Sequence, residues 1–334
     1  MAGFFARRYS GPLESARGSW FVSVMRAAFL VLLLLGLLVS GGPFALTANA
    51  EATPEPSHQL RLATLAPRGS NLGKAFQRLR NELREKTNGQ VELKMYYGGV
   101  AGDEETVVRK MRVGQMDGAL LTSTGLGALV PQVLVLQAPG LITSYPALDD
   151  VRKELATDFD AMFAKAGYKL VSWGDSGQIR IFSKHKIQHP NDLRGVRPWV
   201  WRGSPTMRAF IDAAGANGVT MGLPEVFSAL QTGMVDTVIA SSIGVLSFQW
   251  HTKLKTITKP GGGIVVGAYD IRQDKLDALP KEARDHILSS AVEHAEEFRE
   301  GGRRFDEEAT AALMQRLQAV NIWRNQQAWQ MVQA

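Results

Sequence analysis

The chain of 334 residues contains no cysteine, and this single absence removes several chemistries. Without a thiol there is no disulfide scaffold, cysteine nucleophile, thiolate metal site, iron–sulfur cluster or lipid anchor on a cysteine. Histidine is also scarce: six residues are present, and none stands in the spacing of a zinc-binding pair. The sequence therefore predicts neither a metal site nor a cofactor.

Catalytic signatures are missing as well. The sequence has no G-x-S-x-G nucleophile elbow and no phosphate-binding P-loop. Gly125-Leu126-Gly127 lacks the third glycine of a dinucleotide-binding fingerprint, so it predicts a turn. Asp103 and Glu104 form the only carboxylate pair in an expected cleft, and helix capping explains them. An exported enzyme on this fold therefore stays an alternative without a catalytic constellation to support it.

Basic residues are not concentrated along the chain, which argues against a nucleic-acid partner. Part of the formal charge of +6 comes from four arginines at the N-terminus, which precede an apolar run (27–39) and Ala48-Asn49-Ala50. This order is typical of a secretory signal peptide (1–50) cleaved after Ala50, and a retained membrane anchor is the alternative. Removing four basic residues and one acidic residue lowers the charge to +3. We therefore expect a periplasmic protein exported by a signal peptide.

Hydrophobic periodicity after the leader predicts strands that alternate with helices. The first set consists of a strand over 60–65, a helix opened by Ser70, a strand over 91–95, a helix from Asp103 and a strand over 118–121. This order predicts a parallel sheet with right-handed crossovers. A second set follows, with strands over 169–173, 178–183, 196–201, 235–240 and 264–271, helices over 205–214 and 223–233, and a helical region over 281–317. Gly301-Gly302 interrupts the last apolar stripe, where we expect a kink or a break between two helices.

Tryptophan placement is the clearest sign of a binding surface. Trp173 ends a predicted strand, and Trp199 and Trp201 stand two residues apart on another. Because strand side chains alternate between faces, both indoles lie on the same side. Core packing is the simpler explanation for one tryptophan. Two indoles flanked by Arg197 and Arg202 fit the wall of a cleft better.

Two sequence blocks carry a resemblance to a known family. They are Asn191-Asp192-Leu193-Arg194-Gly195-Val196-Arg197 and the stretch from Met221-Gly222-Leu223-Pro224-Glu225-Val226 to Gln231-Thr232-Gly233-Met234-Val235-Asp236. With them, the chain from His58 onward resembles the periplasmic substrate-binding subunit of TRAP transporters, the DctP-type family. The resemblance implies a two-lobed α/β fold like that of periplasmic binding proteins, with a mostly parallel sheet flanked by helices in each lobe. It also implies a long C-terminal helix linking lobe I (58–178 plus 262–304) and lobe II (179–261 plus 305–334).

In that family the lobes close on a ligand, usually an organic acid, and an arginine clamps its carboxylate. Alignment from Asp192 puts Trp199 at the position of that arginine and Ala240 at the position of a polar asparagine. Arg180 matches a second arginine of the family, and Arg202 offers a further cation. Segments near the ligand in relatives match Gly102-Asp103-Glu104 and Leu121-Thr122-Ser123. The predicted ligand-binding residues are Glu104, Thr122, Trp173, Arg180, Trp199, Trp201, Arg202, Ala240 and Ser241.

The missing clamp favours a hydrophobic or amphipathic small molecule, because a carboxylate buried without a cation would cost several kcal/mol. The alternative is an organic-acid receptor in which Arg180 and Arg202 replace the clamp. In either case the resemblance implies delivery to the TRAP membrane permease subunits. The branch of the family without the arginine further implies a periplasmic tetratricopeptide-repeat (TPR) protein as a partner.

Overall fold

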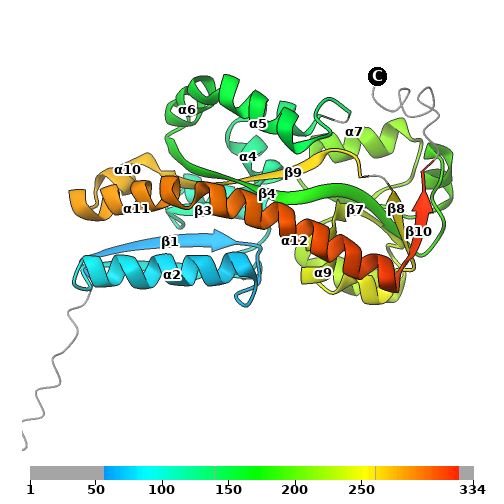
Figure 1. The fold of residues 1–334 in the computed structure, drawn as a ribbon, viewed down its shortest axis with the longest axis horizontal. Helices are drawn as coiled ribbons and strands as arrows, with labels where there is room; N and C mark the ends of the chain where they lie inside the picture. Colours follow the sequence, from blue (N-terminus) through cyan, green and yellow to red (C-terminus); the bar gives the residue numbers. More distant parts are fainter. Residues whose placement is uncertain (1–55, 139, 260, 323–334) are drawn as a thin grey trace, which may run out of the picture. The chain divides into compact units, whose positions relative to one another are not determined.

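A computed structural model describes residues 56–138, 140–259 and 261–322 (Figure 1). The predicted signal peptide (1–50) and residues 323–334 of the predicted lobe II lie outside the described residues. Within the described ranges, no helix combines the length and the apolar character needed to cross a bilayer.

The chain begins with the strand–helix alternation that its sequence predicts. β1 (His58–Thr64) is followed by α2 (Asn71–Lys86), β2 (Val91–Tyr96), α3 (Glu104–Arg112) and β3 (Gly118–Thr122). The side chains of Ser70 and Asp103 accept hydrogen bonds from the first turns of α2 and α3, which fixes where these helices start. β1 pairs in parallel with both β2 and β3. The predicted parallel core of the sheet is confirmed here.

One long strand replaces the two strands predicted over 169–173 and 178–183. β4 (Tyr168–Ser183) continues through both segments because Gly177, at φ 97°, adopts a conformation that lets the strand bend at a register shift without ending. Its first part pairs with β9 (Ile264–Arg272), and its second part pairs with β7 (Thr237–Ser241) and β8 (Thr256–Lys259). All these pairs are antiparallel, so the sheet is mixed where a mostly parallel one was expected.

The complete sheet runs in the order β10-β8-β4-β9-β3-β1-β2, with β7 also on β4. We call β2, β1, β3, β9 and the start of β4 the first half-sheet, and the end of β4 with β7, β8 and β10 the second half-sheet. A separate parallel pair is formed by β5 (Trp199–Trp201) and β6 (Val219–Met221). The other elements are α4 (Ser123–Leu129), η1 (Pro131–Gln137), α5 (Tyr145–Glu154), α6 (Ala156–Lys165), η2 (Pro190–Gly195), α7 (Pro205–Ala213), η3 (Leu223–Glu225), α8 (Val226–Thr232), α9 (Ser242–Ser247), η4 (Trp250–Lys253), α10 (Gln273–Asp277), α11 (Lys281–Glu293), α12 (Ala295–Arg316) and β10 (Gln318–Asn321).

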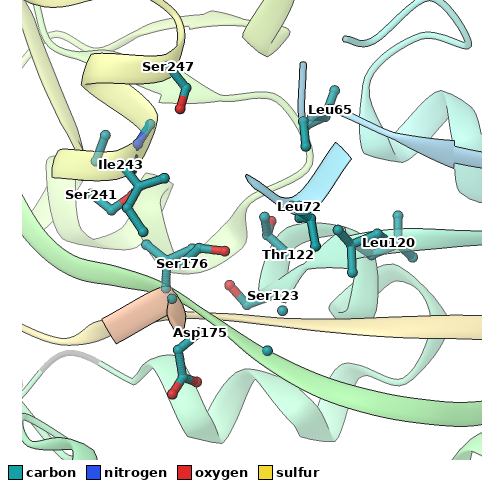
Figure 2. Close-up of a pocket in the computed structure, with 18 of the residues that line it drawn as sticks. Leu65, Leu72, Leu120, Thr122, Ser123, Asp175, Ser176, Ser241, Ile243 and Ser247 are labelled. Atoms are coloured by element: carbon teal, nitrogen blue, oxygen red, sulfur yellow. Dashed lines mark hydrogen bonds between the residues drawn. The ribbon is translucent and has the colours of Figure 1, made fainter. Parts of the chain in front are cut away.

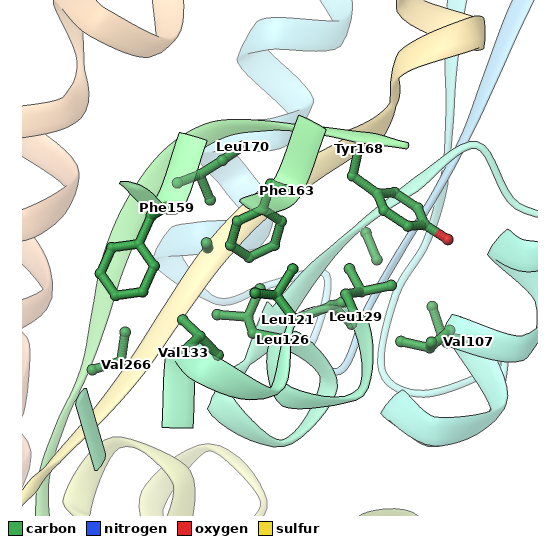
Figure 3. Close-up of a cluster of buried hydrophobic side chains, with 14 of the residues drawn as sticks. Val107, Leu121, Leu126, Leu129, Val133, Phe159, Phe163, Tyr168, Leu170 and Val266 are labelled. Carbon is green, nitrogen blue, oxygen red and sulfur yellow. The ribbon is translucent and has the colours of Figure 1, made fainter. Parts of the chain in front are cut away.

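Each half-sheet has its own hydrophobic core. On the first, α4, η1 and α6 cover one face with side chains such as Leu126, Val133 and Phe163 (Figure 3). On the second, Phe182 and Ile257 pack against a cluster that includes Trp199 and Trp250. The strand β4 contributes Tyr168 and Leu170 to the first core and Phe182 to the second, so it connects the two halves of the sheet.

The long C-terminal helix α12 crosses between the halves (Figure 1). The break in the helical region falls at His294, which ends α11, and α12 continues through Gly301-Gly302 without interruption. The glycines serve close packing instead: a Cβ on Gly302 would lie 2.6 Å from the carbonyl oxygen of Asp175. Farther along, Thr310 donates to Ser242 at 2.6 Å and Leu313 is buried in the second core. The expected helix linking the two lobes is confirmed, whereas the exact lobe boundaries stay a prediction.

Candidate functional site

A large cleft of about 1370 Å³ opens where the two half-sheets meet. Figure 2 shows Thr122 and Ser123 at the end of β3 on one side of it, with Ser241, Ile243 and Ser247 of the β7–α9 junction on the other. Eight of the nine predicted site residues line this cleft: Glu104, Thr122, Trp173, Arg180, Trp199, Trp201, Ala240 and Ser241. The fold thus brings together residues that are more than 130 positions apart.

Glu104 holds the β3–α4 corner of the cleft in place. Its carboxylate accepts hydrogen bonds from the Thr122 backbone N–H at 2.7 Å, the Thr122 hydroxyl at 2.8 Å and the Gly125 N–H at 2.7 Å. Burial raises the pKa of Glu104 to about 7, although these hydrogen bonds favour the charged form. With its two oxygens engaged by these donors, Glu104 fixes the position of Thr122 at the cleft.

The raised pKa of Glu104 predicts a pH-dependent stability. The folded protein holds this proton up to about pH 7, whereas the unfolded chain releases it near 4.5. Folded molecules therefore bind more protons between these values, and the free energy of unfolding should fall as pH rises, by at most about 1.4 kcal/mol per pH unit. Urea unfolding at pH 5, 6 and 7 measures the slope. Glu104→Gln should flatten it, and the surface variant Glu105→Gln is the matched control; equal slopes in all three proteins would contradict the assignment.

Arg180 is the cation that the strands contribute to the cleft, which Lys74 and Arg78 of α2 and Arg304 of α12 also line. It lies on β4 directly opposite Ala240 of β7, in the antiparallel register of these strands. Its guanidinium donates to the carbonyl oxygen of Thr258 at 3.3 Å and to the side chain of Gln178 at 3.1 Å. Its Nε atom is buried without a hydrogen-bond partner, and no carboxylate of the described residues lies within ion-pair distance. Burial lowers the pKa of Arg180, but a guanidinium stays charged at any physiological pH.

The tryptophans form an aromatic wall that is partly core. Trp199 and Trp201 do lie on one side of β5, with ring centroids 5.5 Å apart. Trp199 is only 1% exposed, stacks edge-on with Trp250 and donates its indole N–H to the Met221 carbonyl at 3.0 Å. Most of the Trp199 side chain therefore belongs to the hydrophobic core and not to the surface of the cleft. The indole N–H of Trp201 is buried without a partner, and Trp173 packs against Phe159 at the opposite side.

Arg202 is the predicted site residue that does not line the cleft. Its guanidinium pairs with Asp103 at 3.4 Å and with Glu225 at 3.1 Å, and its side chain is 47% exposed. Because β5 ends at Trp201, Arg202 follows in a turn and leaves the alternation that directs the indoles. Its use as a second clamp for a carboxylate is therefore not supported by its position.

The described residues contain no group of three or more histidine and carboxylate side chains that could hold a metal ion.

Residues 62–334 match the family described as bacterial extracellular solute-binding protein, family 7, DctP. The chain belongs to this family. The family consists of solute-binding receptors, and its members bind small molecules.

Individual relatives of this family 7 protein agree with the match. A solute-binding protein of Albidiferax ferrireducens is 26% identical over 286 residues, which cover 84% of this chain and 83% of that protein. The C4-dicarboxylate-binding periplasmic protein DctP of Rhodobacter capsulatus is 25% identical over 269 residues, 78% of each chain. A TRAP periplasmic solute binding protein from Citrobacter koseri, solved with bound D-glucuronate, superposes with a TM-score of 0.73 at 25% identity, covering 82% of this chain and 93% of that one.

Sequence reasoning missed several polar residues of the family 7 cleft. Ser176 and Gln178 line it from the bend of β4, and Gln178 contacts Arg180 directly. The carboxylate of Asp306 on α12 accepts the Gln178 backbone N–H at 2.9 Å and lies close enough to Arg180 to act on its charge. The position of Gln178 two residues before Arg180 on the same predicted strand could have indicated that Gln178 belongs to the cleft. Nothing in the sequence links Asp306 to a strand 128 residues earlier.

Proposed function

We propose that this protein is the receptor of a TRAP-type transport system and captures a small organic acid in the cleft, with the carboxylate paired to Arg180. The observation that carries the proposal is the state of Arg180 itself. A half-buried guanidinium with an unpartnered Nε and no ion pair is a costly arrangement. A ligand carboxylate would supply the missing charge and a second acceptor in a fork geometry that suits arginine.

Relatives support an acid over a purely hydrophobic ligand. The Rhodobacter capsulatus protein is named for C4-dicarboxylates, and the Citrobacter koseri structure holds D-glucuronate. Both ligands carry a carboxylate. The earlier preference for a hydrophobic ligand rested on the replacement of the family's clamp by Trp199, which is mostly occupied by core contacts. Arg180 alone therefore becomes the clamp of the organic-acid alternative, without Arg202.

The transport role extends to location and partners. The periplasmic naming of the Rhodobacter capsulatus relative supports a periplasmic receptor, and the predicted signal peptide would export it. In this role the loaded protein delivers its ligand to the TRAP permease subunits in the membrane. A TPR partner rests on the resemblance to the arginine-less branch alone and stays a prediction.

A comparison of acids with their amides tests the proposed function. Ligand binding raises the melting temperature by mass action, so a panel of organic acids should produce upward shifts that increase with concentration. Each acid is matched by its primary amide, which has nearly the same shape and no charge. We expect shifts from acids and none from amides at equal concentration. Equal shifts from an acid and its amide, or from neutral sugars alone, would contradict the carboxylate–Arg180 pair.

A further inference from the structure

The cleft does not end at the ligand clamp. The same cavity continues over the first half-sheet, between α2 on one side and α11 and the start of α12 on the other. Figure 2 shows the entrance, where Leu72 and Leu120 lie next to each other beside Thr122. The apolar part of its walls comprises Leu72, Phe76, Leu79, Leu120, Ile287 and Ala291, and Lys74, Arg78, Glu82 and Ser290 line the same helices. We call this extension, over residues of β3, β9 and β4, the side channel.

Small residues in register form the floor of the side channel and leave space above the sheet. Thr122, Gly267 and Gly174 stand side by side on β3, β9 and β4, so one row of the sheet carries almost no side chain. In the next row, Ser172 faces Tyr269, whose ring meets Phe76 edge-on at 5.3 Å. An added Cβ on Gly174 would meet no atom within 4 Å, which shows open space above it.

The far end of the side channel is closed. Lys86 of α2 and His286 of α11 lie 3.1 Å apart, and His286 also lies 3.7 Å from Glu82. Below them Leu83 and Ala283 are 0% exposed and fill the space between the helices. The side channel is therefore closed at this end, while the exposed side chains of Lys74 and Arg78 on α2 line its outer rim.

We propose that the side channel holds the unbranched apolar tail of a monocarboxylic acid whose head group pairs with Arg180. This inference rests on the proposed function, because the clamp fixes the carboxylate. Gly174 stands six positions before Arg180 on β4, a span of at most about 20 Å at roughly 3.3 Å per residue because the strand bends at Gly177, and the arginine side chain covers part of that span. A cavity of about 1370 Å³ also exceeds the ~300–1,000 Å³ of ordinary small-ligand sites. A medium- or long-chain fatty acid fits both dimensions.

Calorimetric titration of the purified protein with butanoate, octanoate and dodecanoate tests the side channel. Burial of each added methylene strengthens binding by up to about fourfold, so octanoate should bind at least tenfold more tightly than butanoate. Gly174→Leu should remove this gain and leave butanoate unchanged. Gly195→Leu is the matched control, since it adds the same group at an exposed glycine outside the cleft that also has open space.

The outcomes separate the two proposals. If butanoate binds through Arg180 but longer chains gain nothing, the side channel is overturned and the proposed function stands. If Gly174→Leu weakens butanoate and dodecanoate equally, the side channel is also overturned. If no acid binds, both proposals fail. Should Gly174→Leu not fold, Ala291→Phe fills the same space from α11, and loss of the chain-length gain in that variant supports the side channel; its retention overturns it.

Discussion

Replacing Arg180 with alanine should lower the affinity for the acid ligand by at least about 30-fold. Removal of one partner of a desolvated charge pair costs about 2–5 kcal/mol, because the other charge stays buried without compensation. The other lysine and arginine residues that line the cavity, Lys74, Arg78 and Arg304, lie on α2 and α12 and not on the strands around Ala240. Arg180→Lys keeps the charge but loses the fork, so its affinity should fall between those of the wild type and the alanine variant.

Arg180→Ala should not destabilise the protein in the absence of ligand. In the absence of ligand Arg180 is a half-buried cation with an unpartnered Nε, and its removal takes away that cost. We therefore expect the melting temperature of unliganded Arg180→Ala to equal or exceed that of the wild type, while the shift caused by acids disappears. Arg202→Ala is the control and should change affinity less than about fivefold, as for an exposed ion pair. A larger loss for Arg202 than for Arg180 would overturn the assignment of the clamp.

Asp175→Asn should reduce the free energy of unfolding by about 3–5 kcal/mol, the cost of breaking a buried ion pair. Asp175 has a side chain that is 0% exposed and lies 2.7 Å from Arg152 of α5 and 2.8 Å from Arg303 of α12. Figure 2 shows its carboxylate directed away from Ser176 and the cleft. The substitution keeps the shape of the side chain but leaves two guanidinium groups without their shared anion. Urea unfolding of the purified protein measures the loss.

Two further variants separate charge from packing at Asp175. Asp149→Asn removes a carboxylate that also pairs with Arg303 but is 34% exposed, so it should cost less than half as much. Adding Arg152→Met to Asp175→Asn should recover part of the lost stability, because the unpaired cation is replaced by an apolar chain. If the double variant is less stable than the single one, the network is not held by charge compensation.

The sequence predicted those parts of the fold whose signals are local. Ser70 and Asp103 cap their helices as expected, and the alternation of β1, α2, β2, α3 and β3 follows apolar periodicity. The continuity of β4 was not predicted, because Gly174 and Gly177 are typical of a turn when only neighbours are considered. Pairing with β9 before the bend and with β7 and β8 after it keeps β4 a single strand. No helix break at Gly302 was found either. A glycine is required there because the backbone of Asp175, 127 positions earlier, packs against it.

Several residues of the cleft lining were predicted where strand alternation and family motifs coincide, and their contacts with a ligand stay a prediction. Arg180, Trp201 and Ala240 all line the cleft as expected. Arg202 does not line the cleft because β5 ends one residue earlier, and the end of a three-residue strand depends on its pairing with β6 rather than on local sequence. The side channel was invisible for the same reason: an empty row needs Gly174 and Gly267 in register, and register is a property of the assembled sheet.

The central position of β9 also governs how the chain is completed during synthesis. β9 lies between β3 and β4, although 80 residues of chain separate its start from the end of β4. Until residue 272 has been made, both neighbours present unpaired edges, and such edges are the usual starting points of misassembly. The sheet therefore stays open between β3 and β4 until β9 is available to pair with both.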